Sequence, residues 1–369
     1  MIASTSCSLH REPHSLPHAS VGPRLLCAAL LGGLALLTGC ASVRPERIGV
    51  DRMGYGQIIA ESWKRQTLLN VVRLRYGDAP VFLEVASVIN SYSVGGRTSA
   101  GASLPSAVDP NVFTLDAEGI WSNTPTVTYQ PLIGDRFTRS LLQPIPPTAV
   151  FQMLQAGWSA NLVISTVVSS INGLRNDTLG IGGDPGFFQA VEALTRIQRA
   201  GGFGIRVEPR KDGGAVVLVL RRGTVDKQLQ EDARRVRELL GLEEGLDEFE
   251  VSYGLLPRNT HDVAVLSRSM MEVMLNLGAG VELPAQHVAD GRASPAPPAE
   301  SLPNVLVHIH SGSAAPADTY TAVQFKDLWY WIDDTDIASK RTFTFLMLLF
   351  SLAETGQPAP TPVVTVPSR

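Results

Sequence analysis

The sequence has few cysteines: Cys7, Cys27 and Cys40 are the only ones among its 369 residues. Cys7 and Cys27 precede residue 40, in a stretch with the character of a cleaved leader, so a mature chain would keep one thiol. One thiol cannot form an intramolecular disulfide, and it cannot supply the paired cysteines of redox motifs or zinc sites. Cysteine-based redox catalysis and cysteine-based metal sites are therefore excluded for the mature chain.

A strong charge of one sign is also lacking. The chain carries 31 basic and 35 acidic residues, a formal net charge of −4, and loss of a leader containing Arg11, Glu12 and Arg24 makes it slightly more acidic. Proteins that grip nucleic acid present strongly basic surfaces. We therefore expect no nucleic-acid partner. The hydrophobic content of 44% is ordinary for a globular chain, and the length suits two or three domains.

No apolar run reaches the ~20 residues that a membrane-spanning helix needs. The most apolar stretch begins at Leu25, directly after the basic Arg24, and ends in Leu37-Thr38-Gly39-Cys40. A basic entry, a short apolar middle and small residues before a cleavage point are typical of a secretory signal peptide. We assign residues 1–39 to that peptide, with a start nearer Val21 or Leu25 as the alternative.

Leu37-Thr38-Gly39-Cys40 resembles the lipobox of bacterial lipoproteins. The resemblance implies cleavage before Cys40, covalent lipid on Cys40, and a lipidated tether over residues 40–55. Cys40 is followed by Ala41 and not by Asp, the residue that resembles the inner-membrane retention signal of enteric bacteria. This implies that the chain is lipid-anchored at the periplasmic face of the outer membrane.

Residue spacing predicts an α+β fold, with small mixed and antiparallel sheets packed with helices in two or more subdomains. The region 56–180 is expected to combine helices with a β-hairpin. Its predicted elements are a helix over 56–76, strands over 81–93, 112–121 and 126–130, short helices over 136–142 and from Pro147, and a buried strand over 162–171, with a helix as the alternative for the last.

The region 181–282 predicts a central α-β-β-α-β unit followed by one more helix. Its expected elements are a helix over 185–199 capped by Asp184, strands over 203–208 and 215–221, a helix from Thr224 to Gly241, a strand over 249–253, and a helix over 261–277 capped by Thr260. The order resembles that of small ring-forming domains in envelope secretion machines, a likeness of element order alone. Met270, Met271 and Met274 are expected in the core.

The C-terminal part divides into a proline-rich linker over 283–303, strands and a buried helix over 304–356, and a proline-rich tail over 357–369. Strands are expected over 305–310, 319–325 and 328–332, and Asp334 or Asp336 is expected to cap the helix over 337–353.

His308 and His310 are the only candidates for metal ligands. One residue separates them, so both side chains would lie on the same face of a strand. A third ligand of defined spacing is missing, so two polar surface histidines are the preferred interpretation. Asp333, Asp334 and Asp336 resemble the start of a calcium loop, but the later Gly and Glu are absent. No catalytic or cofactor-binding residue is predicted, and the only cofactor expected is the lipid on Cys40.

These features favour an outer-membrane-anchored periplasmic lipoprotein that acts as a non-enzymatic scaffold or adaptor for envelope protein partners. One alternative is an oligomeric envelope export or pore component that inserts a β-hairpin, about residues 81–130, into the membrane. A second alternative is a periplasmic hydrolase. The sequence leaves the oligomeric state open.

Overall fold

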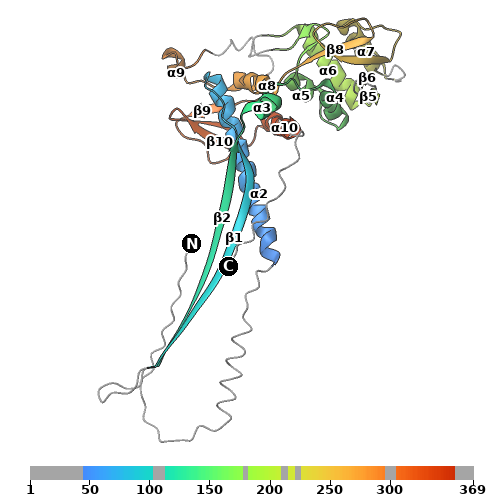
Figure 1. Ribbon diagram of the computed structural model, residues 1–369. Helices are drawn as coiled ribbons and strands as arrows, with labels where there is room; N and C mark the ends of the chain where they lie inside the picture. The colour runs from blue at the N-terminus through green and yellow to red at the C-terminus, as the bar shows by residue number, and fades with distance from the viewer. Residues whose placement is uncertain are drawn as a thin grey trace, which may run out of the picture. The chain divides into compact units, whose positions relative to one another are not determined.

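The computed structural model describes residues 45–102, 113–177, 182–208, 215–220, 226–295 and 305–353. Cys40, the predicted lipobox and the predicted tail over 357–369 lie outside these ranges. The described chain has an α+β fold, as predicted (Figure 1). It divides into two compact units, residues 1–59 with 83–130, and residues 60–82 with 131–369.

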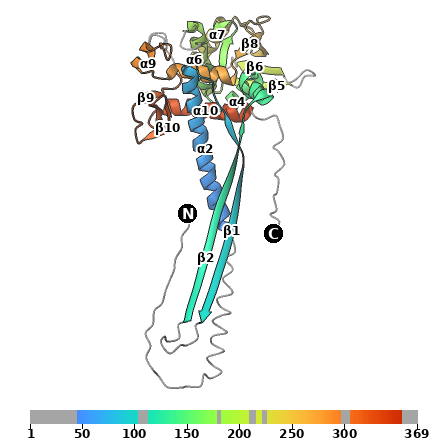
Figure 2. The same ribbon diagram turned by 60° about the vertical axis from the view of Figure 1, so that its left-hand side comes forward.

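The first unit contains the predicted hairpin. Strands β1 (Leu83–Ala102) and β2 (Phe113–Pro131) form a two-stranded sheet and run in opposite directions (Figure 2). Strand β1 continues past residue 93, the predicted end of the first strand, and includes the small residues up to Ala102. Helix α2 (Pro45–Arg75) begins in this unit and ends in the second. It starts before the predicted residue 56, because Pro45 suits the first helical turn, so most of the predicted tether is helical.

A six-stranded mixed sheet organises the second unit, in the order β4-β3-β8-β7-β6-β5. The strands are β3 (Val168–Ile171), β4 (Leu174–Arg175), β5 (Phe203–Glu208), β6 (Ala215–Leu220), β7 (Glu248–Tyr253) and β8 (Asp262–Ser267). All neighbours are antiparallel except β7 and β8, which are parallel. The strand β5 forms one edge of this sheet.

The predicted α-β-β-α-β unit is confirmed as α6 (Pro185–Arg199), β5, β6, α7 (Lys227–Leu240) and β7. Phe187, Val191, Leu194 and Ile197 of α6 are buried at the expected helical spacing. Gly241 ends α7 with a φ of 63°. The predicted cap Thr224 is wrong, because the Asp226 carboxylate accepts the hydrogen bond from the Gln228 N–H.

The expected strand over 162–171 is wrong for most of its length. Helix α5 (Ala160–Val167) comes first, and only the last four residues form β3. The buried residues Ala160, Val163, Ile164 and Val167 follow a helical spacing of three and four, which overrides the β-branched composition. The alternative of a helix was therefore correct for this part.

The single helix expected over 261–277 is also wrong. Its first part is β8, which pairs with β7 and β3, and helix α8 (Met270–Leu277) follows. Ser269 caps α8, since its hydroxyl accepts from the Glu272 N–H and the Glu272 carboxylate accepts from the Ser269 N–H. Thr260, the predicted cap, donates to Glu243 instead. Met270 and Met274 are buried and Met271 packs beside them, as expected.

Further short helices connect these parts. Helix α3 (Gly134–Phe137) and the π-helix η1 (Thr138–Leu142) match the predicted helix over 136–142, and α4 (Pro147–Gln155) begins at Pro147 as expected. Helix α9 (Ala285–Ala289) lies within the predicted linker. The imidazole of its buried His287 forms a 2.7 Å hydrogen bond with the Tyr76 hydroxyl. The Tyr76 hydroxyl forms a second hydrogen bond, of 2.6 Å, with the Tyr330 hydroxyl. The linker prediction is therefore wrong over α9.

A three-stranded sheet of order β10-β11-β9 completes the second unit, from β9 (His310–Gly312), β10 (Thr319–Phe325) and β11 (Leu328–Asp333). Helix α10 (Ile337–Ala353) buries Phe343, Phe345, Leu346 and Leu349, as predicted. Asp336 accepts a 3.0 Å hydrogen bond from the Ser339 N–H at its start, as one of the two predicted caps. Within the described ranges, every helix is too short or too polar to cross a bilayer.

Candidate functional site

The two candidate metal ligands, His308 and His310, have different surroundings. His310 begins β9, whereas His308 lies before the strand, so the predicted shared strand is wrong. The His310 imidazole lies 2.9 Å from Glu282 and 3.3 Å from Asp333. His308 is exposed, and its backbone N–H donates to the Ser339 hydroxyl. Among the residues that the structure describes, no group of three or more His, Cys, Asp or Glu side chains is arranged to hold a metal ion.

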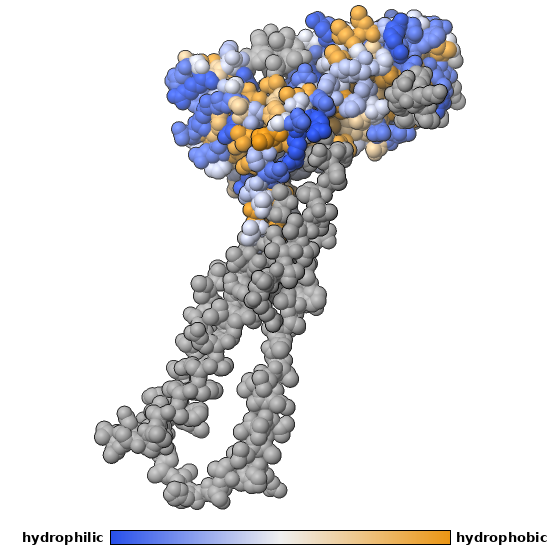
Figure 3. Space-filling model, in the orientation of Figure 1, coloured by the Kyte–Doolittle hydropathy of each residue, from blue (hydrophilic) through white to orange (hydrophobic). Residues whose placement is uncertain are grey.

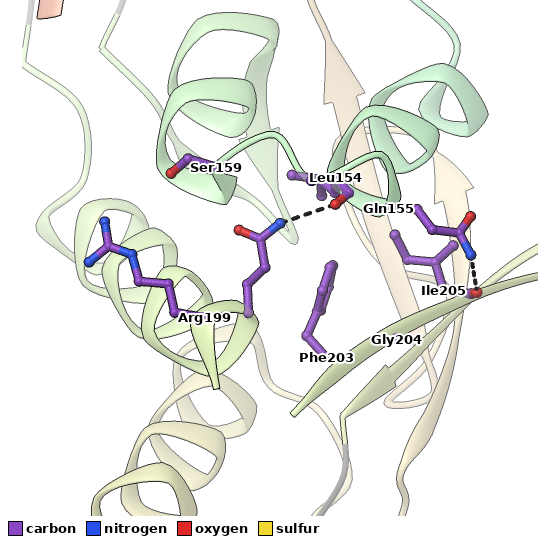
Figure 4. Close-up of a pocket in the computed structure, with 9 residues that line it drawn as sticks. Leu154, Gln155, Ser159, Arg199, Phe203, Gly204 and Ile205 are labelled. Carbon is purple, nitrogen blue, oxygen red and sulfur yellow. Dashed lines mark hydrogen bonds between the residues drawn. The ribbon is translucent and has the colours of Figure 1, made fainter. Parts of the chain in front are cut away.

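A groove of about 600 Å³ lies beside β5, and Figure 4 shows the residues that line it. Its walls come from the end of α4, the turn that follows, the end of α6, and β5 itself. The chain turns sharply at Gly157, which lines the groove, and at Gly201, between α6 and β5, where φ is 95° and 71°. In Figure 3, the visible face of the second unit mixes hydrophilic residues with small hydrophobic clusters.

Gln198 holds the walls of the groove together. Its side-chain amide donates to the backbone carbonyls of Leu154 and Trp158, at 3.1 and 2.8 Å, and accepts from the Ala160 N–H at 2.8 Å. These backbone groups lie at the end of α4 and the start of α5, where helices leave carbonyls and N–H groups without partners. One side chain of α6 therefore fixes the turn between two other helices.

The edge strand β5 turns part of its backbone toward the groove. The Ile205 carbonyl accepts a 3.3 Å hydrogen bond from the Gln155 side chain, so this carbonyl points away from β6 (Figure 4). In an antiparallel pair, alternate residues bond to the neighbouring strand and the residues between them face outward. The backbone groups of Phe203 and Val207 therefore share the outward direction of Ile205. Strand β5 is an open edge over half of its residues.

Arg199 places a positive charge at the rim of the groove. It is exposed, and none of the described residues forms an ion pair with it. Arg206 differs, because hydrogen bonds to Glu248 and Glu208 raise its pKa and neutralise its charge locally. The floor is apolar, since Leu154 is buried and Phe203 and Ile205 are partly buried. The groove thus combines an apolar floor, open backbone groups and the cationic side chain of Arg199.

None of the groove residues was singled out from the sequence. The strand over 203–208 and the glycine turn before it were predicted, but the position of β5 at the edge depends on the order of strands in the sheet. The roles of Gln155 and Gln198 depend on residues about 40 to 50 positions away. Comparisons with protein-family models, curated proteins and solved structures each gave no significant match.

Proposed function

We propose that this chain is an outer-membrane-anchored periplasmic adaptor that binds an extended segment of a partner protein in the groove beside β5. The observation that carries the proposal is the open edge of β5, with the outward carbonyl of Ile205, next to a groove of about 600 Å³. Lipid on Cys40 would hold the folded body at the membrane, as the lipobox implies. The role requires no catalytic residue.

Strand addition explains why these features occur together. An extended peptide that joins a sheet edge gains affinity from main-chain hydrogen bonds, and hollows for alternate side chains supply specificity. Phe203 and Ile205 would provide the main-chain partners, and Leu154 would contribute to an apolar floor. Arg199 favours a segment with a carboxylate, because a guanidinium binds carboxylates in a planar, bidentate arrangement.

The groove is tested by selecting displayed random 12-residue peptides on the lipidated chain in detergent and measuring their affinity by fluorescence anisotropy. Ile205→Pro removes the outward N–H and hinders strand addition, whereas Ile205→Val keeps that N–H. We expect at least a tenfold loss of affinity for the proline variant and little change for the valine variant. Equal binding to both variants, with unchanged circular dichroism, would overturn the groove as the binding site.

The charge at the rim is tested with Arg199→Glu. Selected peptides are expected to be acidic and to bind this variant at least tenfold more weakly at low salt, because like charges then face each other. Arg139→Glu, an exposed arginine outside the groove, is the matched control. Selection of peptides without carboxylates, or equal losses in both variants, would contradict the role of Arg199.

The anchor is tested separately with Cys40→Ser. The wild-type chain should incorporate radioactive fatty acid and fractionate with the outer membrane, and the variant should lose both properties. Cys27→Ser is the control, because it changes a cysteine of the leader. Labelling of the Cys40→Ser chain would show that the lipobox interpretation is wrong, whatever the groove binds.

A further inference from the structure

The hairpin of β1 and β2 is a long ribbon. The strands have 20 and 19 residues, and within the described residues no third strand pairs with either of them. At ~3.3 Å per residue, each strand extends for ~65 Å. A two-stranded ribbon is marginally stable in water because it buries little apolar surface. Such a ribbon gains stability when further strands join its two outer edges.

Both outer edges are suited to pairing. Proteins usually protect an edge strand with lysines, prolines or a very short length. Neither strand contains a lysine, and Pro125 is the only proline before the final residue of β2. The two edges also match each other in length to within one residue. One hairpin therefore supplies two complementary edges, so a second copy of this chain is the partner that fits both.

The sequence of β2 alternates in polarity. Residues at every second position of a strand lie on the same face. In the sequence of β2, one set of alternate positions is mostly apolar and holds Phe113, Leu115, Ala117, Gly119, Trp121, Asn123, Pro125, Val127 and Tyr129. The other set is polar except for Ile120 and holds Thr114, Asp116, Glu118, Ile120, Ser122, Thr124, Thr126, Thr128 and Gln130. Val127 and Tyr129, whose exposure is described, are 37% and 59% exposed. This is the alternation of a strand between lipid and water, and such a strand needs ~9–11 residues, fewer than β2 has.

We propose that the hairpins of several copies pair edge to edge, β1 of one copy against β2 of the next, and insert into the membrane as one sheet. The two edges are different surfaces, so the contact is head-to-tail, and repeated head-to-tail contacts form a ring when the rotation closes. The apolar face of β2 faces lipid, and the polar face lines a water-filled pore. The hairpin proposal stands independently of the groove beside β5.

Mixed single-cysteine chains test the contact between copies. The mature chain has no other free thiol once Cys40 is lipidated, so one chain carries Ser93→Cys in β1 and a co-expressed chain carries cysteine at Ser122, Thr124 or Thr126 in β2. Oxidation should link the two different chains for at least one β2 position. Cysteine at the exposed Arg234 of α7 is the control and should not link. Native mass measurement of the detergent-extracted chain should show a single multiple of the protomer.

Dye release from lipid vesicles tests the face that meets lipid. Leu115→Asp places a charge on the apolar face, and Thr114→Asp places the same charge on the polar face of the same strand. We expect Leu115→Asp to reduce dye release at least tenfold and Thr114→Asp to leave it within twofold. A monomer in native mass measurement without inter-chain disulfides would overturn the pairing. An oligomer that releases no dye, or equal effects of the two substitutions, would overturn the membrane insertion.

Discussion

The side-chain amide of Gln155 donates a 3.3 Å hydrogen bond to the backbone carbonyl of Ile205. The bond links the last residue of α4 to the edge strand β5. Its length lies beyond the usual range for N–H···O bonds, and Gln155 is exposed, so water competes for both groups. The Gln155 amide therefore forms a weak hydrogen bond with the Ile205 carbonyl, the acceptor that an added strand would use.

Replacing Gln155 with alanine should strengthen peptide binding. The substitution frees the Ile205 carbonyl, and a net hydrogen bond contributes about 1 kcal/mol, which corresponds to roughly a fivefold gain in affinity. Fluorescence anisotropy with a peptide selected on the wild-type groove measures the change. Gln152→Ala, an exposed position on the same helix, should leave affinity unchanged. Weaker binding to Gln155→Ala would show that Gln155 contacts the peptide itself.

Acid should destabilise the six-stranded sheet through Asp262. Burial alone would raise the pKa of this carboxyl, but hydrogen bonds from Arg258 and Ser252 lower it below its ordinary value. A carboxyl whose pKa is lower in the folded state stabilises the fold above the unfolded pKa of about 3.9, and this stabilisation is lost as pH falls through the folded pKa. We expect the free energy of unfolding to decrease as pH falls below about 4.

Asp262→Asn tests this assignment. The variant should lose about 2 kcal/mol of stability at pH 7, because it removes charge-assisted hydrogen bonds from a buried site, and should show a shallower acid slope. Urea unfolding followed by tryptophan fluorescence at pH 7, 5 and 3.5 measures both effects. Asp318→Asn changes an exposed aspartate and should behave like wild type. Identical acid slopes for the two variants would contradict the role of Asp262.

Arg268 should be among the most stabilising side chains of the second unit. Its buried guanidinium donates to the carbonyls of Ser165 and Thr166, at 3.0 and 3.1 Å, and to that of Asp177. Burial lowers its pKa to about 10, while Asp177 and Glu272 oppose that shift, so the side chain stays charged at neutral pH. The cation lies at the carboxyl end of α5, where the helix dipole favours positive charge.

Arg268→Leu should lower the free energy of unfolding by about 4 kcal/mol. The substitution removes the guanidinium donor from the carbonyls of Thr166 and Asp177, at a cost of about 1–3 kcal/mol for each, whereas the Ser165 carbonyl keeps its hydrogen bond from the Asn176 amide. Arg268→Lys should recover only part of the loss, because an ammonium cannot reproduce the planar fork of donors. Denaturant unfolding gives the values, with the exposed Arg139→Leu as control. A loss below about 1 kcal/mol would mean that water replaces the guanidinium.

Gly280 should not tolerate a side chain. A Cβ atom at this position would overlap the backbone carbonyl oxygen of Val307, and the Ile309 N–H donates to the Gly280 carbonyl at 2.9 Å. Moving one backbone segment away from the other would weaken that hydrogen bond. Gly280→Ala should lower stability by about 3 kcal/mol, the upper end for overpacking. Gly278→Ala is the matched control, because the nearest atoms to its Cβ would lie 3.7 Å away. Thermal unfolding compares the two.

Sequence patterns predicted the elements whose periodicity agrees with their packing. Phe187, Val191 and Leu194 repeat at helical spacing and are buried in α6, and the two strands after them are where the pattern placed them. The failures occur where one predicted element contains two observed ones. In 261–277, β8 ends at Ser267 and α8 begins at Met270, and the polar Ser267-Arg268-Ser269 between them is a break that the prediction of one helix overlooked.

The groove was not predictable, because its parts meet only in the folded chain. Gln155, Gln198 and Arg199 are ordinary polar residues at helix ends, where solvent-exposed side chains are common. Their significance comes from the position of β5 at the edge of the sheet. Strand β5 pairs with β6, and β7 pairs with the opposite side of β6. Sheet order depends on contacts between distant residues, and local spacing carries little information about it.

The position of β3 in the sheet has a consequence for the order of folding. Ser170 of β3 pairs with Leu266 of β8, and the whole segment from α6 to β7 lies between them in the chain. Closing so long a loop costs more entropy than pairing β5 with β6, so local pairs are expected to form first. During synthesis, β3 emerges well before its partner. We therefore expect β3 to join the sheet last, after an interval in which its apolar side chains require protection from aggregation.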